Sequence, residues 1–414
     1  SNPRWPYDTE RELAVPMAVP AMWSRPRQAR IDTREAGTEP SMKITRISST
    51  VVNANMRNWI FVKVETDQDG LYGWGEATLE WKTRTVAGAI EDLAQLIVGE
   101  DPLRIEHLYQ MMYRQHFWKV GIEGMSAISG IEQALWDIKG KALGMPVYKL
   151  LGGAVKEKVM PYASLLPVGN TLGDYQASLV EKLVGAKTYG YTAAKVEVCL
   201  SGPYSHNGLQ ESDEAVVDVV AACREAVGDG FTLMVDVAYA WSEARSALRV
   251  IERLAPYDIF FIETPIDIDD LDGYAFLHER SPIRIAAGEW QNTHFEFLDL
   301  AHRGKLDVLQ PDVGWVGGFT EASKVAQIAA DYGRLLVPHC WKSGIGIAAS
   351  VHLAAATATC PFVEFLPANL SESDLRRDLL TSDLELVDGG IPLPEQPGLG
   401  IEIDRDALSR FAVD

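Results

Sequence analysis

The sequence contains few cysteines, no long apolar run and a minority of basic residues. Four cysteines occur among 414 residues without any close pairing motif, as is typical of proteins in a reducing compartment. No run of eighteen apolar residues is present, so a membrane-spanning helix is not expected. The N-terminal residues also lack the basic-then-apolar pattern of a secretory signal. We therefore expect a cytoplasmic protein without membrane association.

The shortage of positive charge excludes further classes of partner. Lysine and arginine total 38 against 58 acidic residues, which gives a net charge of −20. A protein of this charge is repelled by nucleic acid and by anionic membrane surfaces, so neither is expected as a partner. A small anionic substrate stays compatible, because a bound metal and a nearby lysine act at short range while distant charges are screened.

The sequence also lacks a nucleotide-binding signature. The stretches GWGEA at 73–77 and LLGGA at 150–154 contain glycines, but they match neither the P-loop nor the GxGxxG spacing. Glycine at these positions is expected to serve turns and close approaches of the backbone.

The sequence predicts an N-terminal extension that is followed by two structural regions. With 47% hydrophobic and 23% charged residues the chain is globular, and its length accommodates a large barrel and a second domain. Residues 1–41 are rich in Pro and Arg and predict an N-terminal extension, either a disordered leader or an arm packed on its own or a neighbouring subunit. Residues 42–155 show strand alternation and then helical spacing, which predicts an α+β capping domain whose last long helix stops at Gly144, before Pro146.

The remaining sequence predicts a closed barrel. Apolar runs typical of strands begin near residues 158, 192, 232, 259, 283, 307, 334 and 361, with amphipathic helical segments between them. Eight strands is the number that closes an α/β barrel of the TIM type, as (β/α)8 or a modified (β/α)7β, and we assign it to residues 156–368. Residues 369–414 do not extend the barrel and are predicted to return to the capping domain. That domain would therefore be formed by N-terminal and C-terminal segments together.

Three carboxylates close successive apolar runs in the barrel region: Asp236, Glu263 and Glu289. They lie 27 and 26 residues apart, about the length of one strand, one helix and two loops, so parallel strands would place them at the same end of the barrel. Carboxylate oxygens without cysteine or histidine suit Mg²⁺ better than Zn²⁺. A single acid of this kind is often a helix cap or a surface residue, but the regular spacing of all three predicts a metal site.

The same spacing continues beyond these acids. After Glu289, intervals of 23, 27 and 25 residues lead to Asp312, His339 and Glu364, and Lys195 closes an earlier apolar run. An aspartate and a histidine at consecutive strand ends predict an imidazole base that a carboxylate orients. The alternative is a structural histidine and an aspartate that caps a turn.

Three stretches then carry a specific family resemblance: LLGGA at 150–154, QPDVGWVGG at 310–318 and PGLGIEID at 397–404. With the order of the predicted elements over roughly residues 43–404, they resemble the enolase superfamily, its mandelate racemase subgroup and the acid sugar dehydratases within it. The middle stretch is similar to enzymes of the L-rhamnonate dehydratase type. The resemblance implies a homo-oligomer that binds Mg²⁺ and acts on a small-molecule sugar acid.

The resemblance also implies a role for each matching residue. The Mg²⁺ ligands would be Asp236, Glu263 and Glu289. His339 would be the base oriented by Asp312. Glu364 would be a hydrogen-bonding acid at the eighth strand, and Lys195 would be the first lysine of the family's Lys-x-Lys motif.

Two departures from the family pattern weaken a two-base reaction. Glu197 stands where that motif has its second lysine, the opposite-face base of the racemase. Ala238 stands where the racemase has Asn and galactonate-type dehydratases have a catalytic His. A 1,1-proton transfer with inversion needs an acid/base group on each face, whereas elimination can use one base. For Glu197 itself, contact with a substrate hydroxyl and a structural pair with Lys195 stay open.

These observations predict a hydro-lyase, a Mg²⁺-dependent dehydratase of an aldonate or aldarate. His339 would remove the proton next to the carboxylate, and the metal would carry the charge of the resulting enediolate. Loss of the β-hydroxyl would then give a 2-keto-3-deoxy acid. One alternative is a racemase or epimerase of a 2-hydroxy acid that uses Lys195 opposite His339. Another is a non-catalytic binding protein that keeps the barrel.

Substrate specificity is expected from the capping loops and the barrel mouth. By analogy with the family, the loops near 53–59 and 80–83 would cover the mouth and contact the distal end of a polyol chain. The residues concerned are Arg57, Trp59, Trp81 and Lys82, with loop packing or solvation as the alternative. Trp315 would either wall the pocket or fill the core.

Overall fold

The computed structural model describes residues 42–413 except residues 56, 115–116, 372 and 383. The predicted extension at 1–41 lies outside the described residues, and so does the choice between a leader and an arm. All four cysteines are buried and free. No described helix combines the length and the apolar character that crossing a membrane requires.

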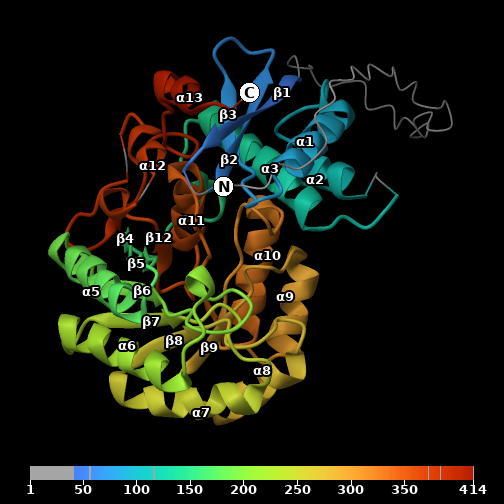
Figure 1. Ribbon diagram of the computed structural model, residues 1–414. Helices are drawn as coiled ribbons and strands as arrows, with labels where there is room; N and C mark the ends of the chain where they lie inside the picture. The colour runs from blue at the N-terminus through green and yellow to red at the C-terminus, as the bar shows by residue number, and fades with distance from the viewer. Residues whose placement is uncertain (1–41, 56, 115–116, 372, 383, 414) are drawn as a thin grey trace, which may run out of the picture. The chain divides into compact units, whose positions relative to one another are not determined.

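The capping region is built on a three-stranded antiparallel sheet of β1 (Ile44–Asn53), β2 (Asn58–Thr66) and β3 (Tyr72–Glu76). The helices α1 (Thr83–Ile97), α2 (Ile105–Arg114) and α3 (Ile122–Leu143) lie beside it (Figure 1). Alternate residues of β2, namely Ile60, Val62 and Val64, are fully buried against these helices, since alternate side chains of a strand share one face. Helix α3 ends at Gly144, whose φ of 65° is left-handed, as predicted.

The glycines of the GWGEA stretch let α3 approach β3 closely. A Cβ atom at Gly73 would overlap the carbonyl oxygen of Ala134, and a Cβ atom at Gly75 would overlap that of Gly130. Close backbone packing therefore explains these glycines, in agreement with the sequence prediction.

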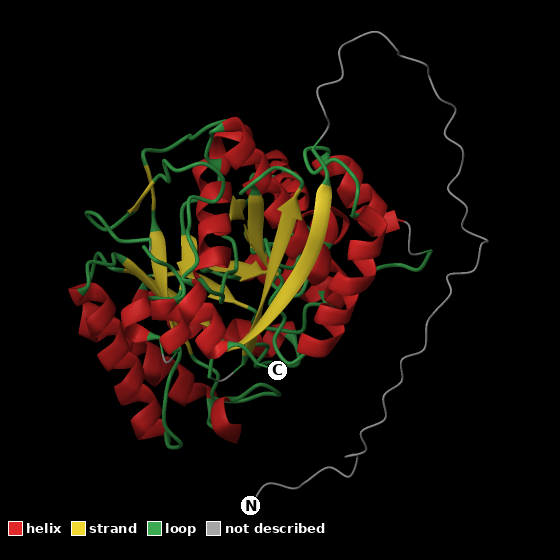
Figure 2. Cartoon of the chain, turned by 90° about the horizontal axis from the view of Figure 1, so that it is seen from above, coloured by secondary structure: helices red, strands yellow, loops and turns green. Residues whose placement is uncertain are grey.

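The barrel has eight parallel strands, which alternate with seven helices among the described residues in a (β/α)7β order. Figure 2 distinguishes the helices, in red, from the strands, in yellow. The strands are β5 (Pro161–Leu165), β6 (Ala193–Glu197), β7 (Thr232–Asp236), β8 (Ile259–Glu263), β9 (Arg284–Ala287), β10 (Val308–Leu309), β11 (Leu335–Leu336) and β12 (Val363–Phe365). The helices are α5 (Leu172–Thr188), α6 (Asp213–Val227), α7 (Ala244–Leu254), α8 (Leu271–Arg280), α9 (Thr293–His302), α10 (Gly318–Asp331) and α11 (Gly344–Ala355). The predicted strand starts are confirmed to within a few residues.

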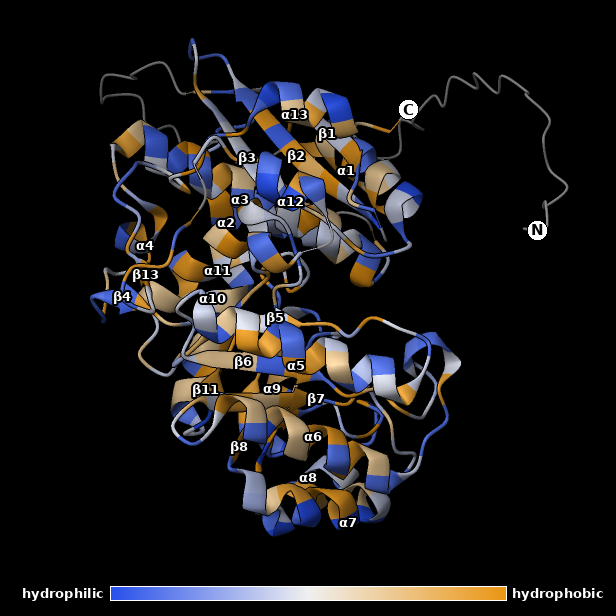
Figure 3. Ribbon diagram, turned by 60° about the vertical axis from the view of Figure 1, so that its left-hand side comes forward, coloured by the Kyte–Doolittle hydropathy of each residue, from blue (hydrophilic) through white to orange (hydrophobic). Residues whose placement is uncertain are grey.

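Strand pairing follows chain order around the barrel and returns from β12 to β5. Between β11 and β12, the Leu336 N–H donates to the Thr359 carbonyl at 3.0 Å. The outer helices are amphipathic, as α7 illustrates (Figure 3): Ala247, Val250 and Leu254 are buried, while its arginines are exposed. The barrel thus buries both faces of its sheet and leaves the strand ends to carry polar side chains.

The C-terminal segment runs back past the barrel to the capping sheet. The strand β13 (Ile391–Pro392) pairs antiparallel with β4 (Lys158–Val159), which precedes the barrel. After the short helix α12 (Asp374–Asp378), the helix α13 (Arg405–Phe411) leads to a backbone hydrogen bond of 2.9 Å from Val413 N–H to the Val51 carbonyl in β1.

His352 of α11 joins the same C-terminal segment to α4 (Val147–Leu150). Its Nδ1 accepts the backbone N–H of Tyr148 at 3.1 Å, so its Nε2 carries the hydrogen and donates to the Leu399 carbonyl at 3.1 Å. The Tyr148 N–H thus requires an unprotonated Nδ1 and hence the neutral imidazole, and the side chain is fully buried.

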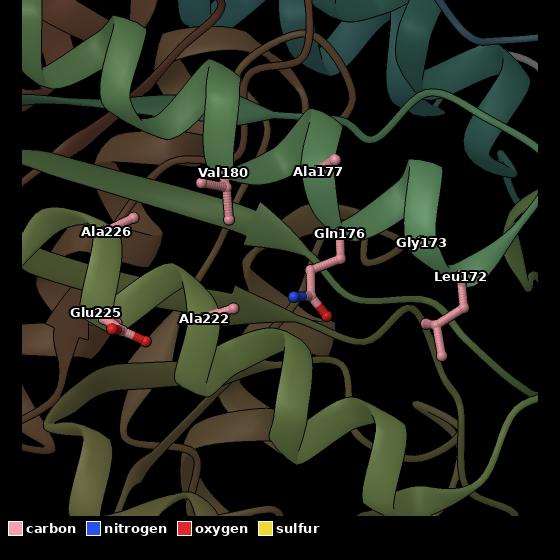
Figure 4. Close-up of a pocket in the computed structure, with 8 residues that line it drawn as sticks. All are labelled: Leu172, Gly173, Gln176, Ala177, Val180, Ala222, Glu225 and Ala226. Carbon is pink, nitrogen blue, oxygen red and sulfur yellow. The ribbon is translucent and has the colours of Figure 1, made fainter.

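The outer wall of the barrel carries a groove between α5 and α6 (Figure 4). Its lining is largely small and apolar, with Leu172, Ala177, Val180 and Ala222 beside the polar Gln176. None of the predicted site residues lines this groove.

Candidate active site

A cavity of about 530 Å³ lies at the carboxyl ends of the barrel strands. The predicted site residues that line it are Trp81, Lys195, Glu197, Asp236, Glu289, Trp315, His339 and Glu364. Residues predicted from six different strand ends and one capping loop thus share one cavity, which is the position expected for a site in a TIM-type barrel.

Lys195 lies among three carboxylates beside this cavity. Its Nζ is 2.7 Å from Glu263 Oε1, 3.0 Å from Glu364 Oε1 and 3.6 Å from Asp236 Oδ2. Asp236 and Glu263 are register partners at the ends of β7 and β8, so the even spacing in the sequence corresponds to neighbouring positions in the barrel. Lys195 is 4% exposed and Glu263 is 1% exposed, so these charges act on one another at short range and with little screening.

The carboxylates of this cluster differ in their pKa values. Burial raises the pKa of Glu263 to about 8, with a smaller opposing effect of Lys195 and further raising by Asp236. Burial also raises the pKa of Glu289. Burial acts in the same direction on Glu364, but Lys195, His339 and hydrogen bonds outweigh it and bring its pKa down to about 2. The four carboxyl groups of Asp236, Glu263, Glu289 and Glu364 outnumber the cationic side chains of Lys195 and His339 that they contact, a condition that favours a bound cation.

Asp236 is oriented by the loops that follow β7 and β8. Its Oδ1 accepts the hydroxyl of Thr264 and the backbone N–H of Ala238, both at 2.9 Å. Thr264 and Ala238 adopt left-handed φ angles of 47° and 43°, which are strained for residues other than glycine. The strain is consistent with a backbone held in place to fix one carboxylate oxygen and leave Oδ2 toward Lys195.

The donor set of Asp236, Glu263 and Glu289 fits a hard divalent cation by its chemistry, since carboxylate oxygens with excess negative charge are what such ions bind. Glu289 Oε1 also accepts the hydroxyl of Tyr239 at 3.0 Å. In the part of the chain that the structure describes, no three side chains of His, Cys, Asp or Glu are arranged to hold a metal ion. The Lys195 ammonium stands between Asp236 and Glu263. The match between these three carboxylates and a divalent cation therefore rests on the chemistry of the oxygen donors and on the negative charge of the cluster.

His339 and Asp312 form a hydrogen-bonded pair. Asp312 Oδ2 lies 2.8 Å from His339 Nδ1, and Asp312 Oδ1 accepts the Gly314 N–H at 2.7 Å. The other ring nitrogen, Nε2, is 3.3 Å from Glu289 Oε2, and the indole of Trp315 stacks on the imidazole at 5.0 Å between ring centroids. Burial lowers the pKa of His339, but Glu364, Asp312 and Glu289 outweigh it and raise the pKa to about 9.

Behind this pair lies Lys342, which the sequence analysis missed. Its Nζ is 3.3 Å from Asp312 Oδ2, donates to the Thr78 carbonyl at 3.0 Å and lies 3.8 Å from the centroid of the Trp315 ring. Trp315 Nε1 donates to the same Thr78 carbonyl. The Thr78 carbonyl of the capping region thus accepts hydrogen bonds from both Lys342 and Trp315.

The capping region also fixes the start of α11, directly after His339 in the chain. Glu76 accepts the Ser343 hydroxyl at 2.6 Å and the backbone N–H groups of Ser343 and Gly346 at 3.3 and 3.0 Å. Such a carboxylate satisfies N–H groups that the first turn of a helix leaves unpaired. On the other side, Glu364 accepts the Cys340 N–H at 2.6 Å and the Ser164 hydroxyl at 2.7 Å.

Three of the predicted specificity residues lie outside the main cavity. Arg57 and Trp59 line a smaller adjoining pocket, where the Arg57 guanidinium lies over the Trp341 ring at 3.1 Å from its centroid. Lys82 lines a different neighbouring cavity and pairs with Glu123 at 3.6 Å. Glu197 lines the main cavity, and burial followed by the nearby Asp236 raises its pKa to about 7.

Three aromatic residues form one wall of the main cavity. Tyr239 and Trp290 stack at 4.1 Å between ring centroids, and Tyr204 meets the edges of both. Tyr204 and Trp290 follow predicted strands in the sequence. Their contact with Tyr239 could not be predicted from sequence spacing, because the three loops meet only in the folded barrel.

Comparison with known proteins agrees with this architecture. Residues 178–407 match the family described as enolase C-terminal domain-like, and residues 33–152 match the mandelate racemase / muconate lactonizing enzyme N-terminal domain. The chain belongs to the enolase superfamily. Within this superfamily, the two matched domains place it in the mandelate racemase subgroup, as the sequence resemblance predicted.

Relatives of this enolase superfamily member include D-galactonate dehydratases. The one from Xanthomonas oryzae pv. oryzae (strain PXO99A) is 37% identical over 380 residues, which cover 89% of this chain and 94% of the relative. The one from Pectobacterium atrosepticum is 35% identical over 370 residues, with the same coverage. The chain is therefore an enzyme of the acid sugar dehydratase type, and the alternative of a non-catalytic binding protein is not retained.

Solved structures of the superfamily share the fold. The 3,6-anhydro-D-galactonate cycloisomerase from Zobellia galactanivorans is 32% identical with a TM-score of 0.81, over 90% of this chain and 100% of that chain. An enolase from Agrobacterium radiobacter bound to Na and L-malate is 28% identical with a TM-score of 0.80, over 90% of this chain and 95% of that chain. These neighbours confirm the predicted TIM-type barrel with a capping domain.

Proposed function

We propose that this enzyme is a Mg²⁺-dependent dehydratase of an aldonate or an aldarate, with His339 as its base. The observation that carries the proposal is the placement of His339, whose Nδ1 faces Asp312 while the ring lines a cavity rich in carboxylates. A base beside an oxygen-only cluster suits the removal of a proton next to a carboxylate. A divalent metal is expected from the superfamily, and the choice of Mg²⁺ is part of the proposal.

The reaction would use a small number of side chains. Asp312 keeps a proton on Nδ1. Glu289 is among the carboxylates that raise the pKa of His339, and a cation held by Glu289 would offset that effect, so that an unprotonated Nε2 would take the proton from C2 of the substrate. Lys195 supplies a fixed positive charge for the substrate carboxylate. Mg²⁺, held by the three predicted ligands, would neutralise the negative charge that develops there. The electron pair at C2 expels the C3 hydroxyl, which takes a proton from His339 and leaves as water, and the remaining enol becomes a 2-keto-3-deoxy acid.

The surroundings of Lys195 support elimination over racemisation. Burial lowers the pKa of Lys195, but Glu263 and Glu364 outweigh it and hold the pKa well above its ordinary value. A lysine that stays protonated serves as a cation and does not serve as the second base that inversion needs.

D-galactonate is not proposed as the specific substrate. Ala238 stands where galactonate-type dehydratases have a catalytic His, and an alanine side chain transfers no proton. The substrate is therefore to be identified by experiment among aldonates and aldarates. The homo-oligomeric state and the cytoplasmic location stay predictions.

The test is a screen of purified enzyme with Mg²⁺ against mono- and dicarboxylic sugar acids, with detection of 2-keto-3-deoxy products. We expect turnover within one stereochemical group and its loss by about 10²- to 10⁴-fold in His339→Asn. Exchange of the C2 hydrogen in D₂O without loss of water would indicate a racemase or epimerase instead. Equal turnover by wild type and His339→Asn would contradict the assignment of the base.

A further inference from the structure

A second, smaller pocket adjoins the candidate active site. Its volume is about 50 Å³, and it shares Ser164, Leu165, Leu166 and Trp341 with the wall of the main cavity. Its other walls come from the capping region, including Arg57 and Trp59, and from the segment after β12, including Ser373. The two cavities therefore lie side by side.

Three side chains that line this pocket carry buried polar atoms without a hydrogen-bond partner among the described residues: Trp59 Nε1, Trp341 Nε1 and Ser373 Oγ. Trp59 is 2% exposed and Ser373 is 5% exposed, so bulk water does not readily satisfy them. Buried donors are nearly always paired in folded proteins. Three of them around one small pocket indicate that a group with hydrogen-bond acceptors belongs there.

The kind of donor specifies the acceptor. An indole N–H only donates, and a serine hydroxyl can donate as well. A carboxylate accepts about four hydrogen bonds and donates none, whereas a sugar hydroxyl brings its own hydrogen and needs an acceptor in return. The Arg57 guanidinium, which lies over the Trp341 ring, brings further N–H donors to the same place, while Glu80 at 3.2 Å offsets part of its positive charge. Donors in excess and a guanidinium together match a carboxylate.

We propose that this pocket holds the second carboxylate of a dicarboxylic sugar acid, so that the substrate is an aldarate. The inference rests on the proposed dehydratase function and narrows its substrate class. The first carboxylate would lie beside Lys195 in the main cavity, and the hydroxylated chain would run from there past Ser164 to the smaller pocket. The volume of the pocket suits a terminal group of a few atoms, since one water molecule already needs roughly 10–15 Å³ of such space.

The experiment compares matched pairs of acids with equal chain length and stereochemistry, such as galactarate against galactonate and glucarate against gluconate. The kcat/KM of the wild type is expected to favour the diacid of the accepted stereochemistry by at least about tenfold. Trp59→Phe keeps an aromatic side chain, although a smaller one, and removes the N–H, and Ser373→Ala removes the hydroxyl. Each is expected to lower the diacid-to-monoacid ratio of kcat/KM by about tenfold, mainly through a higher KM for the diacid.

The matched control is Thr359→Val, which removes another buried hydroxyl without a partner among the described residues, on a groove at the outer wall. It should leave the ratio unchanged. A wild-type preference for the monoacid, or variants that lower kcat/KM for both acids alike, would overturn the proposal and leave the dehydratase function intact.

Absence of product from every acid would count against the dehydratase function, and the pocket is then tested by binding. The diacid should raise the melting temperature of the wild type with Mg²⁺ more than the monoacid does, and Trp59→Phe should remove that difference. Equal stabilisation by the two acids would identify the pocket as a water-filled structural cavity.

Discussion

The ammonium group of Lys342 lies 3.3 Å from Asp312 Oδ2, the oxygen that also bonds His339 Nδ1 at 2.8 Å. Lys342 is 1% exposed, and Asp312 is equally buried. A carboxylate held between a lysine and a histidine keeps one orientation, and so does the imidazole that it bonds. Lys342 thus acts on the proposed base through Asp312.

Replacement of Lys342 by Met should therefore reduce turnover. We expect kcat to fall by about 10- to 100-fold, because Asp312 loses a partner that fixes its carboxylate, while KM changes less. The exposed lysine at position 43 provides the control Lys43→Met, which should keep the wild-type kcat. A Lys342→Met enzyme that keeps the wild-type kcat would show that Lys342 does not act on His339 through Asp312.

Removal of metal should lower stability as well as activity. For enzyme treated with a chelator, Mg²⁺ at 100 times its Kd should raise the free energy of unfolding by about 2.7 kcal/mol, because it binds the folded chain only. The Mg²⁺-dependent rise of the melting temperature should be lost in Glu289→Gln and kept in Glu214→Gln, whose side chain is 64% exposed. An unchanged response in Glu289→Gln would remove Glu289 from the ligand set.

His352 predicts a pH dependence of stability that is separate from catalysis. Burial lowers its pKa from 6.5 to about 4, with a smaller opposing effect of the Leu399 carbonyl. Between these values the unfolded chain binds a proton that the folded chain does not, so stability falls as the pH falls from 6.5 to 4 and this contribution is constant below that range. The loss amounts to about 3 kcal/mol.

Urea denaturation across this pH range checks the His352 prediction. The free energy of unfolding of His352→Asn should decline less steeply than that of the wild type, although the variant is less stable at pH 7 because its contacts to Tyr148 and Leu399 are altered. The control His302→Gln replaces an exposed histidine of α9 and should keep the wild-type slope. Parallel curves for wild type and His352→Asn would contradict the assignment.

The close approach of α3 to β3 predicts opposite effects of two Gly→Ala changes in the capping region. Gly75→Ala should lower the free energy of unfolding by about 1–3 kcal/mol, because its Cβ would overlap the Gly130 carbonyl. Gly88→Ala in α1 should leave stability unchanged or raise it by up to about 1 kcal/mol, because that Cβ meets open space in a helix. Thermal unfolding measures both, and a Gly75→Ala variant as stable as Gly88→Ala would contradict the packing argument.

The sequence predicted those parts of the molecule that depend on chain order. In a parallel barrel, each strand end is a fixed number of elements from the next, so Asp236 and Glu263 had to become neighbours once the strands were correctly located. The same reasoning brought His339 next to Asp312. Their catalytic roles stay predictions.

Other parts of the site were not accessible to pattern arguments. Lys342 bonds the carbonyl of Thr78, 264 residues away in the chain, and its burial is a property of the seam between capping region and barrel. Arg57 and Lys82 belong to loops whose direction no periodicity encodes, and they lie beside the main cavity in different neighbouring pockets. Loop geometry and long-range packing, rather than local propensity, determine such positions.

The hydrogen bonds of Glu76 to Ser343 and Gly346 also constrain how substrate enters and product leaves. Glu76 belongs to β3 and is fully buried, as is Ser343, so a swing of the whole capping sheet away from the barrel would expose a carboxylate and break a helix cap at once. These hydrogen bonds therefore hold the capping sheet in place against the barrel. Exchange of molecules with solvent falls to the short segments at its edge, such as the one that carries Trp81, whose side chain is 78% exposed.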